Sequence, residues 1–496
     1  RISDEPKYRT WLRDYMVKHA QYVSVVKDEE KDEKRTYEMY YDFAEPVSKM
    51  VPHRVLATNR GEKEDILKVS LVADETKIND YFQRQLIGKQ ATSLAAPYIE
   101  AAYLDSYKRF IGPAIEREIR NELTEKADEQ AIAIFGENLR NLLLQSPLKG
   151  KVVLGFDPAY RTGCKLAVVD ETGKVLAIQV IYPHKPATAA KREAAGPAFK
   201  KIIEDYQVDM VAIGNGTASR ESELFVAEQL KAVKLDVFYV IVNEAGASVY
   251  SASEVARKEF PDLQVEERSA VSIARRLQDP LAELVKIDPK AVGVGQYQHD
   301  VSQKRLAEQL DFVVETAVYQ VGVDVNTASA QLLQHISGLN KTTAQNLVTY
   351  RDENGVFTAR NQVKKVPRLG PKAFEQAIGF LRIPNGKNVL DNTGIHPESY
   401  PVAQAILEKA EIASKELGTA EAIEKLKQLP VNQLATELEV GSETLTDIIA
   451  SLIQPGRDMR DEMSAPLLRK DVLTMEDLKP GMEMQGTVRN VIDFGA

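Results

Sequence analysis

The spacing of apolar residues changes abruptly near residue 150, and this change limits what the chain can fold into. Residues 101–144 repeat apolar positions at helical spacing, with Ile115 and Ile119 on one face. After Gly150, short β-branched runs separated by turn residues take over; they occupy 152–156, 165–169 and 175–181. Because 496 residues also exceed what one hydrophobic core accommodates, we expect several domains.

Strands and helices alternate after this point. The pattern predicts a helix over 187–206, a strand over 210–213, a helix over 221–232 and a strand over 237–242. Such an order predicts a mixed sheet that helices cover on both faces. Beyond Ser269 the pattern is helical again, and we expect one helix over 300–310 and another over 315–322.

The chain is therefore predicted to be multi-domain and mainly α, with one α/β domain. The predicted parts are a helical N-terminal region (1–148), an α/β domain (149–276), a helical connector (277–330), a basic helical domain (331–390), a second helical domain (391–477) and the first strand of an incomplete small β-barrel (478–496).

Several function classes are excluded by composition. Cys164 is the single cysteine, which excludes a disulfide framework and a cysteine-rich zinc site. The sequence has no run of eighteen apolar residues and no visible signal peptide, so we expect a cytoplasmic protein that does not enter a membrane. We expect no cofactor. Gly214-Asn-Gly-Thr-Ala-Ser-Arg-Glu221 follows a strand but lacks the Gly-Lys-Ser/Thr ending that a nucleotide-hydrolysing loop requires.

Positive charge is concentrated in one segment although the whole chain has a net charge of -9. Residues 331–390 hold nine Lys/Arg and three Asp/Glu, a net charge of +6. Residues 391–477 hold eight Lys/Arg and seventeen Asp/Glu, a net charge of -9. Contacts to phosphates are therefore expected in 331–390, whereas the acidic segment suits a solvated or partner-facing surface.

Two copies of one turn pattern lie in the basic segment. Ile336-Ser-Gly-Leu-Asn-Lys-Thr-Thr-Ala-Gln-Asn-Leu-Val348 places Gly338 and Asn340 at a tight turn, so that amides at the next helix N-terminus can meet a phosphate. Val366-Pro-Arg-Leu-Gly-Pro-Lys-Ala-Phe374 repeats it, with Arg368 and Gly370 at the same two positions. This is the helix-hairpin-helix pattern. The basic residues near the turns are Lys341, Lys364, Lys365, Arg368 and Lys372. A hairpin that only packs domains together is the alternative.

Three carboxylates are candidates for a catalytic site. Asp157 ends the first strand of the α/β segment in Gly155-Phe-Asp-Pro-Ala-Tyr-Arg-Thr-Gly163, which resembles the first catalytic element of ribonuclease H-like nucleases of the YqgF and resolvase branch. Those enzymes hold two divalent metals between carboxylates, and Glu244 and Asp300 are the predicted partners of Asp157. Gln303 stands where the resolvases carry a further acid, so the set is incomplete. Turn and helix-cap roles explain the same residues equally well.

The order of the parts resembles the bacterial Tex family. The strings that carry this resemblance include Gly214-Asn-Gly-Thr-Ala-Ser-Arg220, Glu244-Ala-Gly-Ala-Ser-Val-Tyr-Ser-Ala-Ser253, Ala270-Val-Ser-Ile-Ala-Arg-Arg-Leu-Gln-Asp-Pro-Leu281 and Gly295-Gln-Tyr-Gln-His-Asp-Val-Ser302. The resemblance implies a helical N-terminal region, a YqgF-like domain, helix-hairpin-helix domains and an S1-type RNA-binding barrel, of which 478–496 would be an incomplete part.

The resemblance also implies a function. We expect a non-catalytic transcription accessory factor that binds RNA or DNA with little sequence preference; RNA polymerase or the ribosome are candidate partners. The alternative is a structure-specific nuclease that uses Mg or Mn at Asp157, Glu244 and Asp300. A third alternative is a scaffold that binds proteins only.

Overall fold

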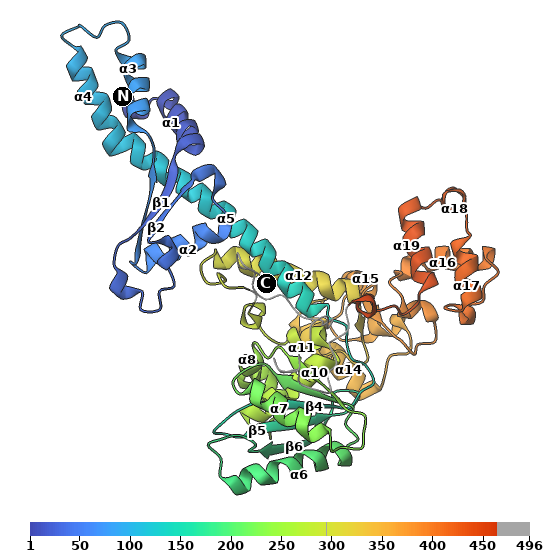
Figure 1. The fold of residues 1–496 in the computed structure, drawn as a ribbon. Coiled ribbons are helices and arrows are strands. Elements are labelled where there is room, and N and C mark those ends of the chain that lie inside the picture. The colour runs from blue at the N-terminus through green and yellow to red at the C-terminus, as the bar shows by residue number, and fades with distance from the viewer. Residues whose placement is uncertain (294, 464–496) are drawn as a thin grey trace, which may run out of the picture. The chain divides into compact units, whose positions relative to one another are not determined.

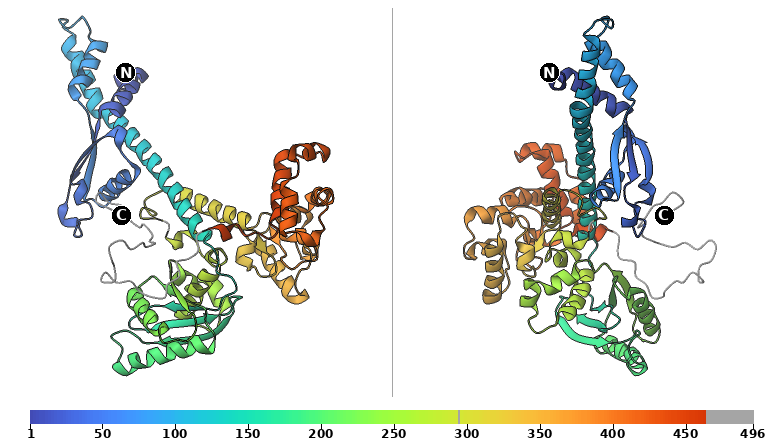
Figure 2. Two further views of the ribbon diagram at one scale, coloured as in Figure 1. Left: turned by 45° about the vertical axis from the view of Figure 1, so that its right-hand side comes forward. Right: turned by 90° about the vertical axis from the view of Figure 1, so that its left-hand side faces the viewer.

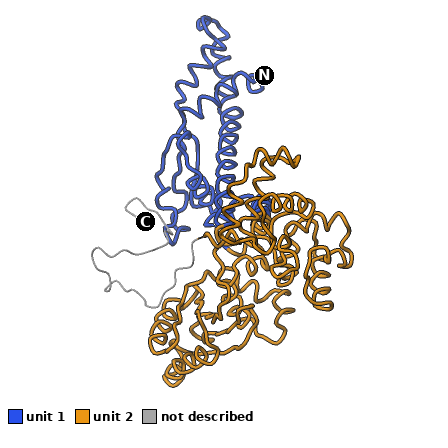
Figure 3. The backbone as a smooth tube through the Cα atoms, turned by 90° about the vertical axis from the view of Figure 1, so that its right-hand side faces the viewer, with its two compact units in different colours: residues 1–140, 293–313 blue, residues 141–292, 314–496 orange. Residues whose placement is uncertain are grey.

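The computed structural model describes residues 1–293 and 295–463. They form two compact units, which are coloured separately in Figure 3: residues 1–140 with 293–313, and residues 141–292 with 314 onward. The predicted strand at 478–496 lies outside the described residues. Among the helices that the structure describes, none combines the length and the apolar character of a membrane span.

The first unit combines helices with a small antiparallel sheet of order β2-β1-β3 (Figure 1). Its strands are β1 (Gln21–Val26), β2 (Asp42–Pro46) and β3 (Leu67–Val72). Its helices are α1 (Pro6–His19), α2 (Pro52–Lys63), α3 (Glu75–Leu86) and α4 (Ala96–Ser106), and α5 (Gly112–Leu143) and α12 (Gln303–Val321) begin in it. The apolar face predicted on 101–144 is correct, because Ile115 and Ile119 are buried in this unit's core with Tyr22, Ile78 and Phe82.

This sheet is a departure from the predicted helical region. The weakest local signal is that of β2, which reads Asp-Phe-Ala-Glu-Pro and whose residues are all exposed or half-buried. The strands pair across intervals of about twenty to fifty residues, as Tyr22 does with Glu45 and Leu71. Tertiary packing, which a local pattern does not contain, therefore decides their conformation.

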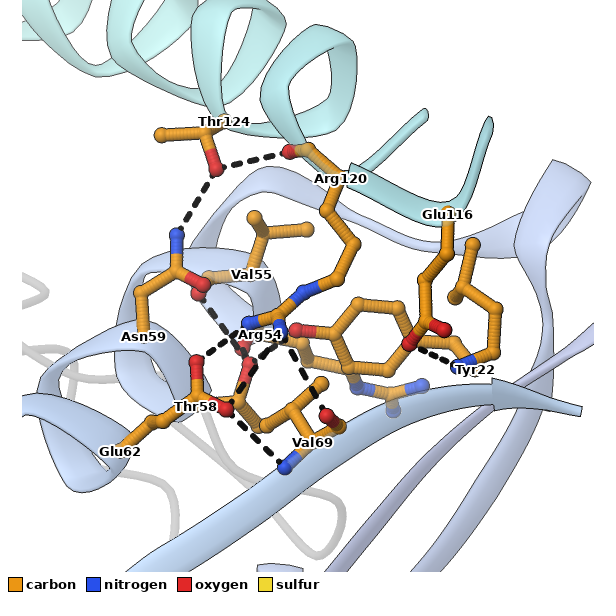
Figure 4. A network of polar contacts seen from close by, with 11 residues as sticks. Tyr22, Arg54, Val55, Thr58, Asn59, Glu62, Val69, Glu116, Arg120 and Thr124 are labelled. Carbon is orange, nitrogen blue, oxygen red and sulfur yellow. Dashed lines mark hydrogen bonds and ion pairs between the residues drawn. The ribbon is translucent and has the colours of Figure 1, made fainter. Parts of the chain in front are cut away.

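A polar network joins α5 to the rest of the first unit (Figure 4). The Arg120 guanidinium of α5 forms an ion pair with Glu62 of α2, and its Nη1 lies 3.4 Å from the Val69 carbonyl oxygen of β3. Glu116 accepts a hydrogen bond from the Leu71 amide at 3.0 Å. Helix α5 thus supplies partners for the Glu62 carboxylate and for the backbone of β3. These contacts fix the face that α5 presents to the sheet.

The second unit contains the predicted mixed sheet, seen from further sides in Figure 2. Its order is β6-β5-β4-β7-β8, with β4–β5–β6 antiparallel and β4–β7–β8 parallel. The strands are β4 (Val153–Asp157), β5 (Cys164–Val169), β6 (Val175–Ile181), β7 (Met210–Gly214) and β8 (Phe238–Val242). Helices α6 (Ala189–Asp205) and α7 (Ser219–Leu230) follow β6 and β7.

Both faces of this sheet are buried, as predicted. Leu154 and Phe156 of β4 pack with Phe199 and Val226 of α6 and α7, whereas Val153 points to the opposite face with Ile273 of α10 (Val265–Gln278). Helix α10 approaches β4 so closely that a Cβ on Gly155 would lie 2.0 Å from the Ala270 carbonyl oxygen. Only glycine allows this contact, which positions α10 directly beside the end of β4.

The remainder of the described second unit is helical. The sheet domain continues with α8 (Ala247–Ala252), α9 (Glu254–Glu259) and α11 (Pro280–Leu284). The two hairpins and a two-residue parallel pair follow, in the order β9 (Val323–Asp324), α13 (Ala330–Leu333), α14 (Lys341–Asn354), a 3-10 helix η7 (Arg360–Lys365), α15 (Pro371–Ile378) and β10 (Leu381–Arg382). The last described helices are α16 (Tyr400–Lys409), α17 (Ala420–Lys427), α18 (Val431–Glu437) and α19 (Ser442–Ile453). The two helices predicted over 300–310 and 315–322 are one continuous helix, α12, so that division was wrong.

Arg360 holds the segment after α15 in place. It is 2 % exposed, and its guanidinium donates to the carbonyl oxygens of Leu381, Thr393 and Ile395 and to the Tyr400 hydroxyl at 2.6–2.9 Å. No carboxylate pairs with this guanidinium directly among the described residues; Asp391 accepts instead from the Arg360 amide and from the Tyr400 hydroxyl. One side chain thus satisfies acceptors on β10, on the segment 393–395 and on Tyr400.

Replacing this side chain should loosen the whole segment. We expect Arg360→Ala to cost about 3–5 kcal/mol locally, because it leaves several buried acceptors without a donor. Amide hydrogen exchange over 381–395 measures this cost. Lys387→Ala, at an exposed position of the same segment, is the matched control and should change exchange little. Equal exchange in the two variants would contradict this role for Arg360.

Candidate nucleic-acid interface

Each hairpin turn contains one residue with a left-handed backbone. Gly338 has φ +83° and Arg368 has φ +64°, at the position that both turns share. Each turn is closed by a hydrogen bond, from the Leu339 amide to Ile336 and from the Leu369 amide to Val366. Arg368 thus adopts the backbone conformation that glycine has in the first turn, at the conformational cost of a residue with a Cβ.

The two hairpins interlock through these turns. A Cβ on Gly338 would lie 2.6 Å from the Ala373 carbonyl oxygen of α15, so glycine is required for the approach as well as for the φ angle. In the other direction, the Asn346 side chain of α14 donates to the Pro367 carbonyl oxygen at 3.0 Å. Each turn therefore packs against the second helix of the other hairpin.

Asn340 has a different role from the one predicted for it. Its backbone is extended (φ -131°), so it does not need glycine's freedom in the turn. It caps α14 instead: its Oδ1 accepts from the Thr343 amide, and its own amide donates to Thr343 Oγ1. Two of the amides expected to face a phosphate are thus already engaged at the first hairpin.

The second hairpin has a more open helix N-terminus. Gly370 is exposed and extended, it provides no side-chain cap, and a Cβ there would meet nothing within 4 Å. Pro371 has no N–H group, and among the described residues no acceptor faces the amides of Lys372 and Ala373. An anion can approach these two amides directly.

Five cations surround the turns, and all are exposed: Lys341, Lys364, Lys365, Arg368 and Lys372. No ion pair holds any of them within the part of the chain that the structure describes. The Lys364 ammonium lies 4.8 Å from the centre of the Phe374 ring, a contact that leaves its N–H groups available. Unpaired positive charge and open amides therefore coincide at the second hairpin.

Asp157 and Glu244 lie close enough to affect each other at the carboxyl ends of β4 and β8. Burial raises the pKa of Asp157 to about 6, a hydrogen bond from Ser269 opposes the shift, and the Glu244 charge adds to it. Burial also raises the pKa of Glu244, against a hydrogen bond from the Gly216 amide. Glu244 Oε2 is buried without a hydrogen-bond partner among the described residues. The fold of the sheet domain thus brings these two carboxylates together.

Asp300 has a partner within the first unit. It belongs to the first unit, where Arg60 Nε lies 3.0 Å from both of its carboxylate oxygens. Gln303, which starts α12, donates to the carbonyl oxygens of Gln298 and Val301. Within the sheet domain, the helix packed beside Asp157 is α10, and its nearby side chains are Ser269 and Glu266.

The sequence reasoning missed Ser269, Glu266 and Lys165. Lys165 pairs with Asp157 across β4 and β5, and its ammonium donates to the Thr162 hydroxyl. The helical period of 265–278 was the available signal for α10, but only the packing of that helix places Ser269 beside Asp157. Two metals bridged by carboxylates need several acidic oxygens; beside Asp157 and Glu244 the third carboxylate, Glu266, is exposed, and the neighbouring Ser269 and Lys165 add a hydroxyl and a positive charge. These residues fit a pair of metal ions poorly, so we derive no metal-dependent hydrolysis step from them.

Family models match most of the chain. Residues 1–135 match "Tex central region-like", 151–278 match "Tex protein YqgF-like domain", 318–382 match "Helix-hairpin-helix motif" and 388–460 match "HHH domain". The boundaries of the α/β match and of the hairpin match differ by a few to a dozen residues from the predicted parts.

Curated relatives agree with these models. The chain is 61% identical over its whole length to the uncharacterized protein YdcI of Bacillus subtilis, of which it spans 69%. It is 45% identical over 98% of its length to the transcriptional accessory protein Tex of Neisseria gonorrhoeae, spanning 64% of it, and 39% identical over 95% to the human S1 RNA-binding domain-containing protein 1, spanning 53%. With these matches and this domain order, the chain belongs to the Tex family.

Proposed function

We propose that this protein is a non-catalytic transcription accessory factor that binds RNA or DNA without sequence preference. The observation that carries the proposal is the second hairpin turn, where the open N-terminus of α15 and unpaired cations share one exposed surface. Contacts of this kind reach phosphates and carry no base information. The printed name of the Neisseria relative, transcriptional accessory protein, supports the cellular role.

Lys364, Lys365, Arg368, Gly370 and Lys372 form the main contact in this proposal. Gly338, Asn340 and Lys341 add a weaker one, because the Asn340 cap competes with an anion for the first hairpin's amides. Lys341 also has the Glu254 carboxylate near it, which Lys258 shares. RNA polymerase or the ribosome as a partner, and a cytoplasmic location, belong to the same proposal.

Charge reversal at the second hairpin tests it. The triple variant Lys364→Glu, Lys365→Glu, Lys372→Glu should weaken binding of random-sequence nucleic acid, whatever the sequence. The slope of log K against log salt should fall by about 3 for duplex DNA, since each lost phosphate contact contributes about 0.9. Fluorescence anisotropy with labelled DNA and RNA at several salt concentrations measures both.

The matched control reverses three exposed lysines of the first unit: Lys18, Lys89 and Lys126. This variant changes the net charge by the same amount. Its slope of log K against log salt should differ from that of the unaltered chain by less than about 0.9, the contribution of one phosphate contact. If both triple variants lose the same affinity and slope, overall charge explains binding and the hairpin does not.

A metal-dependent nuclease is the second candidate, because Asp157 and Glu244 adjoin and one Glu244 oxygen lacks a partner among the described residues. Asp300 would have to leave Arg60 to join them. We favour the non-catalytic role, since the carboxylate set within the sheet domain is small. Cleavage of a branched DNA substrate with Mg or Mn that Asp157→Asn abolishes would establish the nuclease.

The pKa of Asp157 gives a stability prediction with a definite sign. A carboxyl whose pKa is raised in the folded state begins to destabilise the fold when the pH exceeds the pKa that it has in the unfolded chain. The full loss of folding free energy is reached above its folded-state pKa, which is about 6 for Asp157. Asp157→Asn should therefore stabilise β4 by about 1–2 kcal/mol at pH 7–8. Between about pH 6 and pH 4 this gain should vanish.

Asp170→Asn is the control of opposite sign. The Asp170 carboxylate accepts hydrogen bonds from Thr172 and Lys174 that lower its pKa against the effect of burial. Its loss should destabilise the fold at neutral pH, and the effect should shrink as the pH falls below about 4. Hydrogen exchange of the β4 and β5 amides across this pH range measures the stability of both variants. A loss of stability in Asp157→Asn at pH 8 would contradict the raised pKa of Asp157.

A further inference from the structure

A cavity of about 700 Å³ lies within the second unit, away from both hairpin turns. Three parts of the chain line it: α10 and α11 of the sheet domain, the segment around β9 and β10, and residues near Gly456. Its volume is in the range of small-molecule sites in proteins. None of the residues assigned to nucleic-acid contact or to the carboxylate site lines it.

Most charges in the lining are already held in ion pairs. These pairs include Lys149–Asp458, Arg275–Glu259, Lys286–Glu259, Lys286–Glu283, Arg351–Asp352, Arg460–Asp279, Arg460–Asp458 and Arg457–Glu462. Two lining carboxylates, Asp324 and the exposed Glu171, have no ion-pair partner within the described ranges. The paired cations are therefore not available to a ligand without the loss of an existing contact.

Arg382 differs from these lining cations. Its Nη1 donates to the Gly379 carbonyl oxygen at 2.6 Å, and no carboxylate pairs with its guanidinium in the part of the chain that the structure describes. Burial lowers its pKa to about 10, and the charge of the neighbouring Arg360 contributes. A mostly buried guanidinium beside a second cation is costly unless an anion neutralises it.

Two glycines pack directly against the Arg382 guanidinium. A Cβ on Gly322 would lie 2.9 Å from its Cζ and Nε, and one on Gly394 would lie 3.5 Å from its Nη2, so neither residue has a side chain that covers the guanidinium where it lines the cavity. Ser329 and Asn392 line the same cavity and supply a hydroxyl and an amide donor, whereas Arg351 lines it with its guanidinium already bonded to the Val325 and Ala328 carbonyl oxygens. The guanidinium fork matches an oxyanion, and several donors converging on one group suit the oxygens of a phosphate.

We propose that this cavity binds a small phosphorylated molecule, with Arg382 holding the phosphate group. Since three parts of the second unit line the cavity, the ligand would connect the sheet domain with the helical segments that follow it. Binding would then stabilise the unit by mass action.

Titration calorimetry of the whole chain with inorganic diphosphate and with adenosine diphosphate tests the proposal. We expect both probes to bind, and Arg382→Gln to weaken them about tenfold or more, as loss of a charge-assisted hydrogen bond does. Arg257→Gln is the matched control: this arginine also donates to one backbone carbonyl, that of Ala252, but it is exposed on α9. It should leave both affinities unchanged.

Two further measurements keep the result unambiguous. Asn392→Asp adds a negative charge to the lining without a change of size, and should weaken both probes even if Arg382→Gln folds poorly. Without any probe, Arg382→Gln should melt no lower than the unaltered chain, because it removes an unpaired buried charge.

The proposal is overturned if neither probe binds at concentrations up to about 10 mM, or if Arg382→Gln binds them normally. Binding of citrate but not of either probe would replace phosphate by carboxylate as the ligand. If an oligonucleotide of about twelve thymidines binds and Arg382→Gln weakens its binding, while the two small probes do not bind, the site belongs to a nucleic-acid chain and the small-molecule proposal fails.

Discussion

The surface that we propose for nucleic acid forms only because each hairpin turn contains a left-handed residue. With Gly338 at φ +83° the first turn can lie against the Ala373 carbonyl oxygen, and with Arg368 at φ +64° the second turn can receive the Asn346 amide. The interlocked pair fixes the direction of α15. The Lys364 ammonium of η7 lies over the Phe374 ring of α15, the helix whose N-terminus is open.

Two neighbouring arginines differ in how many of their donors the protein itself uses. Arg360 donates to three backbone carbonyls and to a tyrosine hydroxyl, so it stabilises the chain and has few donors left for a ligand. Arg382 is its neighbour, also mostly buried, yet it has one carbonyl partner and a cavity beside it. A buried cation that the protein itself leaves unpaired is where an external anion gains most.

The sheet domain places two neighbouring carboxylates at the carboxyl ends of β4 and β8. Asp157 and Glu244 meet at the strand ends because parallel neighbours of β4 end at the same edge. Near them are Ser269, Lys165 and the exposed Glu266, while Asp300 belongs to the other unit and pairs with Arg60. The raised pKa of Asp157 reflects a carboxyl whose charged form burial has made unfavourable, and to which Glu244 adds a like charge.

Local sequence was enough to assign the class of most parts. A change from helical to alternating period predicted the mixed sheet, and a repeated turn pattern with a local excess of lysine predicted both hairpins, because these signals lie within a few consecutive residues. Long-range packing decided the features that depend on distant partners: the sheet of β1, β2 and β3, the proximity of Ser269 to Asp157, and the unpaired state of Arg382 among the described residues. Whether a charge is paired or a strand is covered depends on residues far away in the chain, and no local pattern contains that information.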